Sequence, residues 1–489
     1  MRENSWPGND SFSELESLGS LLTDLSEVEE DLETPSYKGF RGRRRKAAFT
    51  LTMIWSGTIA LHLFSWGIWV VIGLTTVVGI HALRIMLARP LPAPEPLAET
   101  DQADWPFVSL LVAAKNEEAV VGKLVKTLCN LDYPADRYEL WVIDDSSTDR
   151  TPILLDQLAR EYPQLKVLHR AAGAGGGKSG ALNQVLPLTQ GEILAVFDAD
   201  AQVSQDLLKR VLPLFQRPQV GAVQVRKAIA NADTNFLTQG QSIEMALDAF
   251  FQEQRIALGG IGELRGNGQF VRRLALERCG GWNEETITDD LDLTFRLHLD
   301  QWDIDFLAVP AVDEEGVTRS LALWHQRNRW AEGGYQRYLD YWRFLARNRR
   351  LSPRKTLDLF VFWLIQYILP TASVPDLVMA IARNSSPLLS PLASLTVMLS
   401  FMGMFVGLRR YQQPKALAAP ANANIEDWDN SFWTRLSQSL RGTFYMFHWL
   451  VIVASTTARI SIRPKRLKWV KTIHQGAEDE VWLDLPEQT

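Results

Sequence analysis

The sequence predicts an α/β domain with a doubly wound sheet, inserted between transmembrane helices. Two observations carry this prediction. Apolar blocks of membrane length lie towards both ends of the 489-residue chain, and the region between them alternates short apolar runs with amphipathic segments. Such alternation is typical of βα units, which build a parallel sheet covered by helices on both faces. Right-handed crossovers then give a nucleotide-binding topology.

The composition argues against a nucleic-acid-binding protein and for a membrane-associated one. A net charge of −6 implies no general affinity for nucleic acid. Cys129 and Cys279 have no metal-ligand spacing, so we expect reduced thiols in a cytosolic compartment. Many of the 17 tryptophans flank apolar blocks or basic segments, as aromatic residues do at a membrane interface.

The N-terminal sequence predicts a disordered tail followed by a membrane hairpin. Residues 1–40 are acidic and lack a periodic pattern, so we expect them to be disordered. A basic cluster at 41–46 then precedes an apolar block, 47–87, about twice the roughly 20 residues that one span needs. Ser65 and Trp66 near its middle predict two helices. The positive-inside rule places the basic cluster, and the domain that follows two spans, in the cytoplasm.

The domain is expected over residues 104–350. The predicted strands cover residues 107–114, 140–143, 165–169 and 193–197, and the helices between them cover 116–131, 151–162 and 179–188. Beyond them the pattern is less regular, with long helices expected at 235–258, 290–302 and 319–344. The last of these is rich in Trp, Tyr and Arg, which suits either a membrane-surface helix or one packed on the sheet.

The C-terminal region, residues 356–462, predicts two to three spans and an interfacial helix. Its apolar blocks lie at 357–382, 389–408 and 443–461, and Pro370 and Pro375 should kink the first. Three full spans would place the basic part of the tail, 463–489, outside the cell. Either one block is re-entrant or interfacial, or the positive-inside rule fails here.

The residues Asp198 and Asp200 follow the apolar run Ile193–Phe197, at the strand edge where open α/β sheets bind ligands. Two carboxylates on one short turn suit Mg²⁺ or Mn²⁺, held against a phosphate-bearing substrate. For Asp-X-Asp alone, a solvated acidic loop is the better explanation, but its place at a strand end and the residues around it favour the metal.

Two other segments lie near expected strand ends. Asp144 and Asp145 could accept hydrogen bonds from a base or ribose, or could cap a helix. The Gly-rich run 173–178 is no strict phosphate loop, because Ala172 stands where that motif needs Gly. Lys178 could still approach a diphosphate, although a plain surface turn fits equally well.

Two later motifs also have double interpretations. Asp289 and Asp290 begin a helix, where acids serve as caps, yet a buried carboxylate there could be a general base. Arg327 and Arg329 lie beside Trp330, which suits either phosphate binding or a basic surface against anionic lipid.

The motifs DD, GK, DxD, TDD and QRNRW occur in that order between membrane blocks. This set resembles the membrane-bound inverting glycosyltransferases of family 2, which have the GT-A fold and include cellulose, hyaluronan and chitin synthases. The resemblance covers residues 105–345. Two leading spans, few trailing segments and the run RWAEGGYQRYLDYW make the chain most similar to the cyanobacterial members that glucosylate diacylglycerol.

The resemblance implies UDP-glucose as donor, 1,2-diacylglycerol as acceptor, Mg²⁺ or Mn²⁺ as metal, and a glycolipid precursor as product. It places Asp145, with Asp144 beside it, at the uracil–ribose end of the donor. It assigns the loop of Asn116 and Glu117 to the same nucleotide, and Lys178 to its vicinity.

For the reaction itself, the resemblance makes Asp198 and Asp200 metal ligands, with Asp200 the more direct. Asp290 becomes the catalytic base, although Asp289 stands where the family has Glu. The remaining assignments cover the QxxRW motif, whose Arg holds the diphosphate and whose Trp flanks the acceptor: Gln326, Arg327, Arg329 and Trp330.

Three alternatives stay open. A processive polysaccharide synthase shares QxxRW but needs a pore of many spans, and this chain offers few. A polyprenyl-phosphate glycosyltransferase differs in the acceptor lipid. An inactive membrane scaffold could use the same fold for binding alone. The choice of glucose over galactose as the donor sugar follows from the resemblance and not from any single residue. The protein could lie in a plasma membrane or in a thylakoid membrane.

Overall fold

The computed structural model describes residues 42–98, 105–347, 351–418 and 431–462. The predicted acidic tail, 1–40, and the predicted C-terminal tail, 463–489, lie outside the described residues.

The domain is built on a seven-stranded sheet with the order β3-β2-β1-β4-β6-β5-β7. The first four strands are parallel, as predicted, but β6 runs antiparallel to both β4 and β5, so the sheet is mixed. The strands are β1 (Val108–Ala114), β2 (Tyr138–Asp144), β3 (Leu165–His169), β4 (Ile193–Phe197), β5 (Val220–Ile229), β6 (Gln269–Arg272) and β7 (Asp303–Glu314). The strands β5, β6 and β7 were not predicted from the sequence.

Both faces of the sheet are covered, as a doubly wound domain requires. Side chains alternate along a strand, so Leu110 of β1 lies in one hydrophobic cluster and Leu111 in another on the opposite face. The covering helices and short 3₁₀ turns are α4 (Val121–Cys129), α5 (Thr151–Glu161), α6 (Gly177–Val185), Leu186–Leu188, α7 (Leu207–Val211), Leu212–Gln216 and α9 (Arg273–Arg278).

Three longer helices connect the sheet to the rest of the chain: α8 (Phe236–Ala257), α10 (Asp289–Leu299) and α11 (Ser320–Arg347). A capping box fixes the start of α8, where the Asn235 side chain accepts hydrogen bonds from the Leu237 and Thr238 amides. Residues 331–341 of α11 are buried throughout. The Trp- and Arg-rich helix is therefore packed inside the protein, and its interpretation as a membrane-surface helix is wrong for this stretch.

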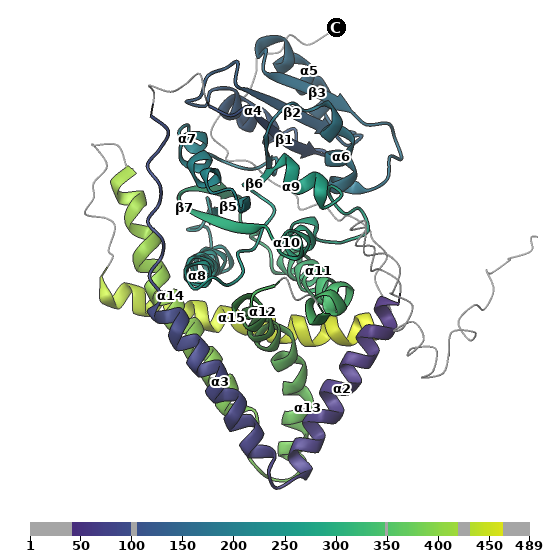
Figure 1. The fold of residues 1–489 in the computed structure, drawn as a ribbon, viewed down its shortest axis with the longest axis vertical. Coiled ribbons are helices and arrows are strands. Elements are labelled where there is room, and N and C mark those ends of the chain that lie inside the picture. Colours follow the sequence, from purple (N-terminus) through teal and green to yellow (C-terminus); the bar gives the residue numbers. More distant parts are fainter. Residues whose placement is uncertain (1–41, 99–104, 348–350, 419–430, 463–489) are drawn as a thin grey trace, which may run out of the picture. The chain divides into compact units, whose positions relative to one another are not determined.

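Two helices joined by a short turn precede the domain, as the predicted hairpin requires, but of these two the structure gives Gly67–Leu87 alone as long and apolar enough to cross a membrane. α2 (Arg43–Leu63) and α3 (Gly67–Leu87) are joined at residues 64–66. The close turn requires glycine at position 67, because a Cβ there would lie 1.9 Å from the Leu61 carbonyl oxygen. Figure 1 shows this hairpin beside the C-terminal helices, with α2 packed on α13 (Leu369–Ala382) and α3 packed on α14 (Ser390–Ala418).

The first C-terminal block bends, as its prolines predict. α12 (Pro353–Trp363) passes through a π-helical turn, Leu364–Ile368, into α13, whose second residue is Pro370. Figure 1 shows the change of direction between α12 and α13. Prolines and π-turns are the usual causes of such bends.

Within the described residues, three helical stretches are long and apolar enough to cross a membrane: Gly67–Leu87, Pro353–Ala382 and Ser390–Tyr411. α2, which begins with basic residues, and α15 (Phe432–Ile462) are not among them. α15 runs across the ends of the other helices (Figure 1) and packs against α2, α8, α11, α13 and α14.

α15 has an exposed apolar face. From Trp433 to Val451, its large exposed hydrophobic side chains are mostly three, four or seven residues apart, spacings that keep them on one side of the helix. They include Trp433, Leu440, Phe444, Phe447 and Val451. Of the alternatives left open for the last apolar block, this geometry favours an interfacial helix.

Candidate active site

A cavity of about 850 Å³ opens at the carboxyl edge of the parallel strands. β1, β2 and β4 run in the same direction, so the residues that follow them meet at this edge. The side chains that line its polar end include Glu117, Lys178, Asp198, Asp200, Asp290, Gln326, Arg329 and Trp330. Motifs that lie far apart in the sequence therefore converge on one site.

Lys178 reaches the first acid of the DxD turn. Its Nζ lies 2.5 Å from Asp198 Oδ1. The helix α6 that carries Lys178 begins at Gly177 behind Gly176, and both glycines adopt positive φ. Burial alone would lower the pKa of Lys178, but the carboxylates of Asp198 and of Asp289 and Asp290 raise it above its usual value. Lys178 is thus a charged group of the cavity and not part of a plain surface turn.

Asp198 and Asp200 are held by neighbouring backbone and side chains. Asp200 Oδ2 accepts a hydrogen bond of 2.9 Å from the Glu315 amide, and the Asp198 amide donates one of 3.2 Å to Asn267 Oδ1. Among the residues that the structure describes, no group of three or more His, Cys, Asp or Glu could hold a metal. Mg²⁺ commonly takes one or two carboxylates and completes its shell with substrate phosphates, and this pair fits that mode of binding.

Asp290 is the second residue of α10 and faces the same cavity. Burial raises the pKa of its carboxyl to about 6, and the adjacent Asp289 carboxylate adds to the effect. Gly266 approaches it closely with φ +82°, and an added Cβ would lie 3.4 Å from Asp290 Oδ2. A carboxylate whose pKa lies near neutrality is suited to accept a proton from a hydroxyl group.

The QRNRW motif lies on α11, and the structure separates its two arginines. Arg329 lines the cavity with Gln326 and Trp330, whereas Arg327 is absent from the lining that the described residues form. The Arg327 side chain is buried and lies 2.7 Å from Glu244 on α8. The prediction that both arginines bind phosphate is therefore not supported for Arg327. Residues two positions apart on a helix point to different sides, which explains the separation.

Burial also affects the cavity arginine. It lowers the pKa of Arg329, while the carboxylates of Asp198 and Asp290 oppose that effect. Arg329 therefore shares the cavity with the expected metal and base residues.

The predicted nucleotide-contact residues lie along the same sheet edge, mostly beyond the cavity. Asp144 Oδ1 accepts a hydrogen bond of 3.0 Å from the Ser147 amide, within the loop before α5. The helix itself begins at Thr151 behind Arg150 and has no side-chain cap, so Asp144 is not a helix cap. Asp145 forms an ion pair with Arg170. Asn116 Oδ1 accepts a hydrogen bond from the Thr148 amide at 2.7 Å. Of the four predicted residues, Glu117 alone belongs to the described lining.

Further charged residues of the cavity were not identified from the sequence. Lys227 on β5 lies 2.8 Å from Glu314 Oε2, and Arg265 lies 2.7 Å from Asp248 on α8. Burial would lower the pKa of Lys227, but Glu314 and the site acids raise it. Gly266 and Gly268 adopt positive φ in the loop that carries Arg265. The two glycines of the sequence RGNG were the feature that could have indicated this loop.

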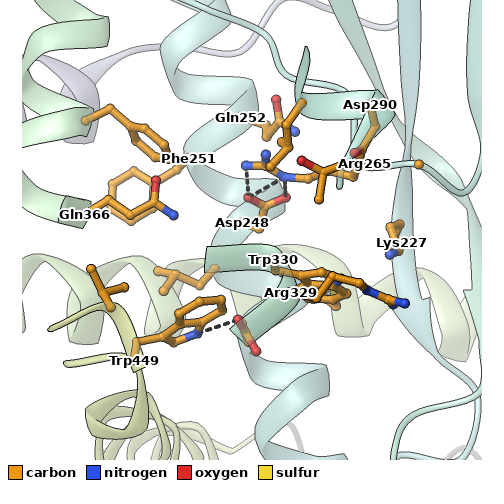
Figure 2. Close-up of a pocket in the computed structure, with 18 of the residues that line it drawn as sticks. Lys227, Asp248, Phe251, Gln252, Arg265, Asp290, Arg329, Trp330, Gln366 and Trp449 are labelled. Carbon is orange, nitrogen blue, oxygen red and sulfur yellow. Dashed lines mark hydrogen bonds and ion pairs between the residues drawn. The ribbon is translucent and has the colours of Figure 1, made fainter. Parts of the chain in front are cut away.

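The cavity continues away from the sheet into an apolar end. Its lining there comes from α3, α8, α13, α14 and α15 and includes Val78, Phe251, Leu369, Val397 and Phe447. Figure 2 shows the change of character, with Lys227 and Asp290 on one side of the view and Phe251 and Trp449 on the other. A single cavity therefore joins a charged end to an apolar end.

Known proteins match the whole chain. A family model described as "Glycosyltransferase like family 2" matches residues 106–333. The chain is 62% identical over 482 residues to the β-monoglucosyldiacylglycerol synthase of Nostoc sp., covering 97% of this chain and 99% of that protein. The chain belongs to glycosyltransferase family 2.

Two further matches extend this family 2 assignment. The β-monoglucosyldiacylglycerol synthase of Synechocystis sp. is 56% identical over 490 residues, which cover 100% of each chain. A solved mannosyltransferase from Pyrobaculum calidifontis matches with a TM-score of 0.53 at 22% identity, covering 83% of this chain and 99% of that chain. The latter likeness confirms the predicted GT-A type of fold.

Proposed function

We propose that the protein transfers glucose from UDP-glucose to the free hydroxyl of 1,2-diacylglycerol, with inversion, to give β-monoglucosyldiacylglycerol. One observation supports this most directly: a single cavity joins the charged sheet edge to an apolar space between helices. A lipid with a hydroxyl head could place its chains in the apolar end and its hydroxyl at Asp290. Relatives named as synthases of this lipid match almost the whole chain.

The proposed reaction is a single displacement. Asp290 accepts the proton of the acceptor hydroxyl as the oxygen attacks the anomeric carbon of the sugar. The bond from that carbon to the diphosphate oxygen breaks on the opposite face, so an α-linked donor gives a β-linked product and UDP leaves. We assign Lys178 and Arg329, which line the cavity, to stabilise the charge that develops on the diphosphate.

The proposed metal is Mg²⁺, with Mn²⁺ as an alternative, held by Asp198 and Asp200. When bound, such an ion neutralises charge on the diphosphate of the donor. We place the uracil–ribose end of the donor along the sheet edge at Asn116 and Glu117 and at Asp144 and Asp145. Asp145 is already paired with Arg170, and its carboxylate keeps further lone pairs that could accept hydrogen bonds from a base or ribose.

The proposed location is an integral membrane protein with its domain on the cytoplasmic face. Arg43 at the basic start of α2 forms an ion pair of 2.7 Å with Asp340 of α11, so this basic end lies beside the domain. The positive-inside rule places such residues in the cytoplasm. The exposed apolar face of α15 would then lie in the interface between bilayer and water.

The proposal is tested by turnover of the purified protein in detergent with Mg²⁺. UDP-glucose and UDP-galactose are each combined with diacylglycerol or with a polyprenyl phosphate, and the products are read by mass spectrometry. We expect one hexose on diacylglycerol, from UDP-glucose alone. A long sugar polymer, or a product on the polyprenyl phosphate only, would replace the proposal by one of the rival transferases. No product with any pair would favour the inactive scaffold.

A further inference from the structure

We propose that Arg327 is a positioning residue, which holds the Trp330 ring at the junction between the polar and apolar ends of the cavity and so sets acceptor binding. This inference rests on the proposed function for the identity of the acceptor. It gives Arg327 a role distinct from that of Arg329, although both belong to one pentapeptide of α11.

The surroundings of Arg327 argue against a direct contact with the donor. Its side chain is 1% exposed, and its Nη2 lies 2.7 Å from Glu244 Oε2 and 3.3 Å from the Tyr445 hydroxyl. A buried guanidinium that already has a carboxylate partner would have to leave it to reach a phosphate, at the cost of an unpaired buried charge.

Arg327 instead contacts the ring that faces the cavity. Its guanidinium carbon lies 4.1 Å from the Trp330 ring centroid and 5.5 Å from that of Trp449. Lys227 Nζ lies 5.4 Å from the Trp330 centroid. These contacts alternate cation and indole from β5 to α15, in the order Lys227, Trp330, Arg327, Trp449. Each of the two cations lies within about 6 Å of an indole centroid, where cation–π attraction is favourable.

Each cation of this stack has its own carboxylate partner. Glu314 lies 2.8 Å from Lys227, and Glu244 lies 2.7 Å from Arg327. The pairs keep both cations in place, so the indole of Trp330 has defined neighbours. Figure 2 shows Trp330 between Lys227 and Trp449, where the charged lining gives way to the apolar lining.

Glu244 also ties this stack to α15. It accepts hydrogen bonds from Trp449 Nε1 at 2.9 Å and from the Tyr445 hydroxyl at 3.3 Å. α8 and α15 approach closely here, because a Cβ at Gly240 would lie 2.3 Å from the Tyr445 ring. A change at Arg327 or Glu244 should therefore displace Trp330 and the apolar end of the cavity while Asp290 and Arg329 stay in place.

The experiment compares Arg327→Lys and Glu244→Gln with Arg329→Lys in the full-length enzyme. Lysine keeps the charge of arginine but loses its planar, stacking group. We expect Arg327→Lys and Glu244→Gln to raise KM for diacylglycerol by about tenfold through misplacement of Trp330. The Kd for UDP, measured by calorimetry without acceptor, should stay at the wild-type value in these two variants and rise in Arg329→Lys.

Two results would overturn the inference. A weaker UDP complex in Arg327→Lys, with an unchanged KM for diacylglycerol, would put Arg327 at the diphosphate. An unchanged KM and an unchanged Kd would remove its positioning role. If the wild-type enzyme does not use diacylglycerol at all, the proposed function fails, whereas the UDP measurement still tests whether the two arginines differ.

A double variant, Glu244→Gln with Arg327→Met, distinguishes a specific effect on KM from a general loss of folding in the single variants. Replacing both partners of a buried ion pair often preserves stability, whereas removing one partner does not. We expect a Tm close to that of the wild type together with a raised KM for diacylglycerol, because Trp330 has lost its cation. A wild-type KM in this folded variant would contradict the inference.

Discussion

The two ends of the cavity differ in how they are built. The polar end is made of charged side chains from strand ends and helix starts, such as Lys178, Asp198 and Asp290. The apolar end is made of side chains from the membrane-type helices, such as Leu369 and Val397, with α15 closing it. Under the proposed function, the polar end would determine donor binding and rate, and the apolar end would determine affinity for the acceptor.

The largest expected effect is at the polar end. Asp290→Asn removes the proposed base while keeping the shape of the side chain, so turnover should fall by at least about 10²–10⁴-fold. The Kd for UDP should stay at the wild-type value, because the base acts on the acceptor. The measurement pairs a glucosyl-transfer assay with calorimetry, and retained turnover would remove Asp290 from this role.

Arg329→Lys should reduce donor binding. A charged hydrogen bond contributes about 1.5–3 kcal/mol, so losing one should raise the Kd for UDP by roughly 10–100-fold. Titration calorimetry checks this, with Arg343→Lys on the same helix, outside the cavity lining of the described residues, as the matched control. Equal UDP affinity in both variants would exclude Arg329 from the diphosphate site.

At the apolar end, Val397→Trp should fill part of the acceptor space. KM for long-chain diacylglycerol should rise by about tenfold, with a smaller effect for short chains, because one methylene is worth roughly 0.8 kcal/mol of burial. Val374→Trp on α13 is the control, since Val374 is similarly exposed but not part of the cavity lining among the described residues. A changed Kd for UDP in Val397→Trp would break the division between the two ends.

The pH dependence tests the electrostatics of the base. Asp290 must be deprotonated to act, and its pKa is raised to about 6, so kcat/KM should fall as the pH drops below that value. Asp289→Asn removes the neighbouring negative charge, so the pKa of Asp290 should decrease and the acidic limb should move to lower pH. An unmoved limb in a pH–rate profile between pH 5 and 8 would contradict this account.

The smallest expected effect concerns stability. Folding raises the pKa of Asp290, so its contribution to stability is present at low pH and lost as the pH rises through about 6. The Asp290→Asn variant has no carboxyl group to ionise here, so it does not lose this stability as the pH rises. Its Tm at pH 8 should therefore exceed that of the wild type by about 2 °C. The gain should disappear near pH 4, where Asp290 is protonated, and scanning calorimetry at the two pH values checks it.

Local pattern predicted the first half of the domain well and the second half poorly. β1 to β4 are short apolar runs with helices between them, so each can be read from its own residues. β6 has four residues and pairs with β4 and β5 across long stretches of chain, which no local pattern reveals. The same long-range pairing explains why Lys227 and Arg265 were missed.

The site shows the same contrast. Lys178, Asp198 and Asp290 follow local motifs, and the structure brings all three to one cavity. Helical periodicity could have separated Arg327 from Arg329, because residues two apart on a helix are rotated by slightly more than half a turn. The partner of Arg327, Glu244, is 83 positions earlier in the chain, and only the fold brings the two together.

The most direct test of the central claim is the structure of the product formed by wild-type enzyme and Asp290→Asn from UDP-glucose and diacylglycerol. Mass spectrometry counts the sugars, and NMR gives the anomeric configuration. We predict one β-linked glucose on diacylglycerol with the wild type and none with the variant, which should still bind UDP. An α-linked product, or continued transfer by Asp290→Asn, would contradict the proposed inverting mechanism.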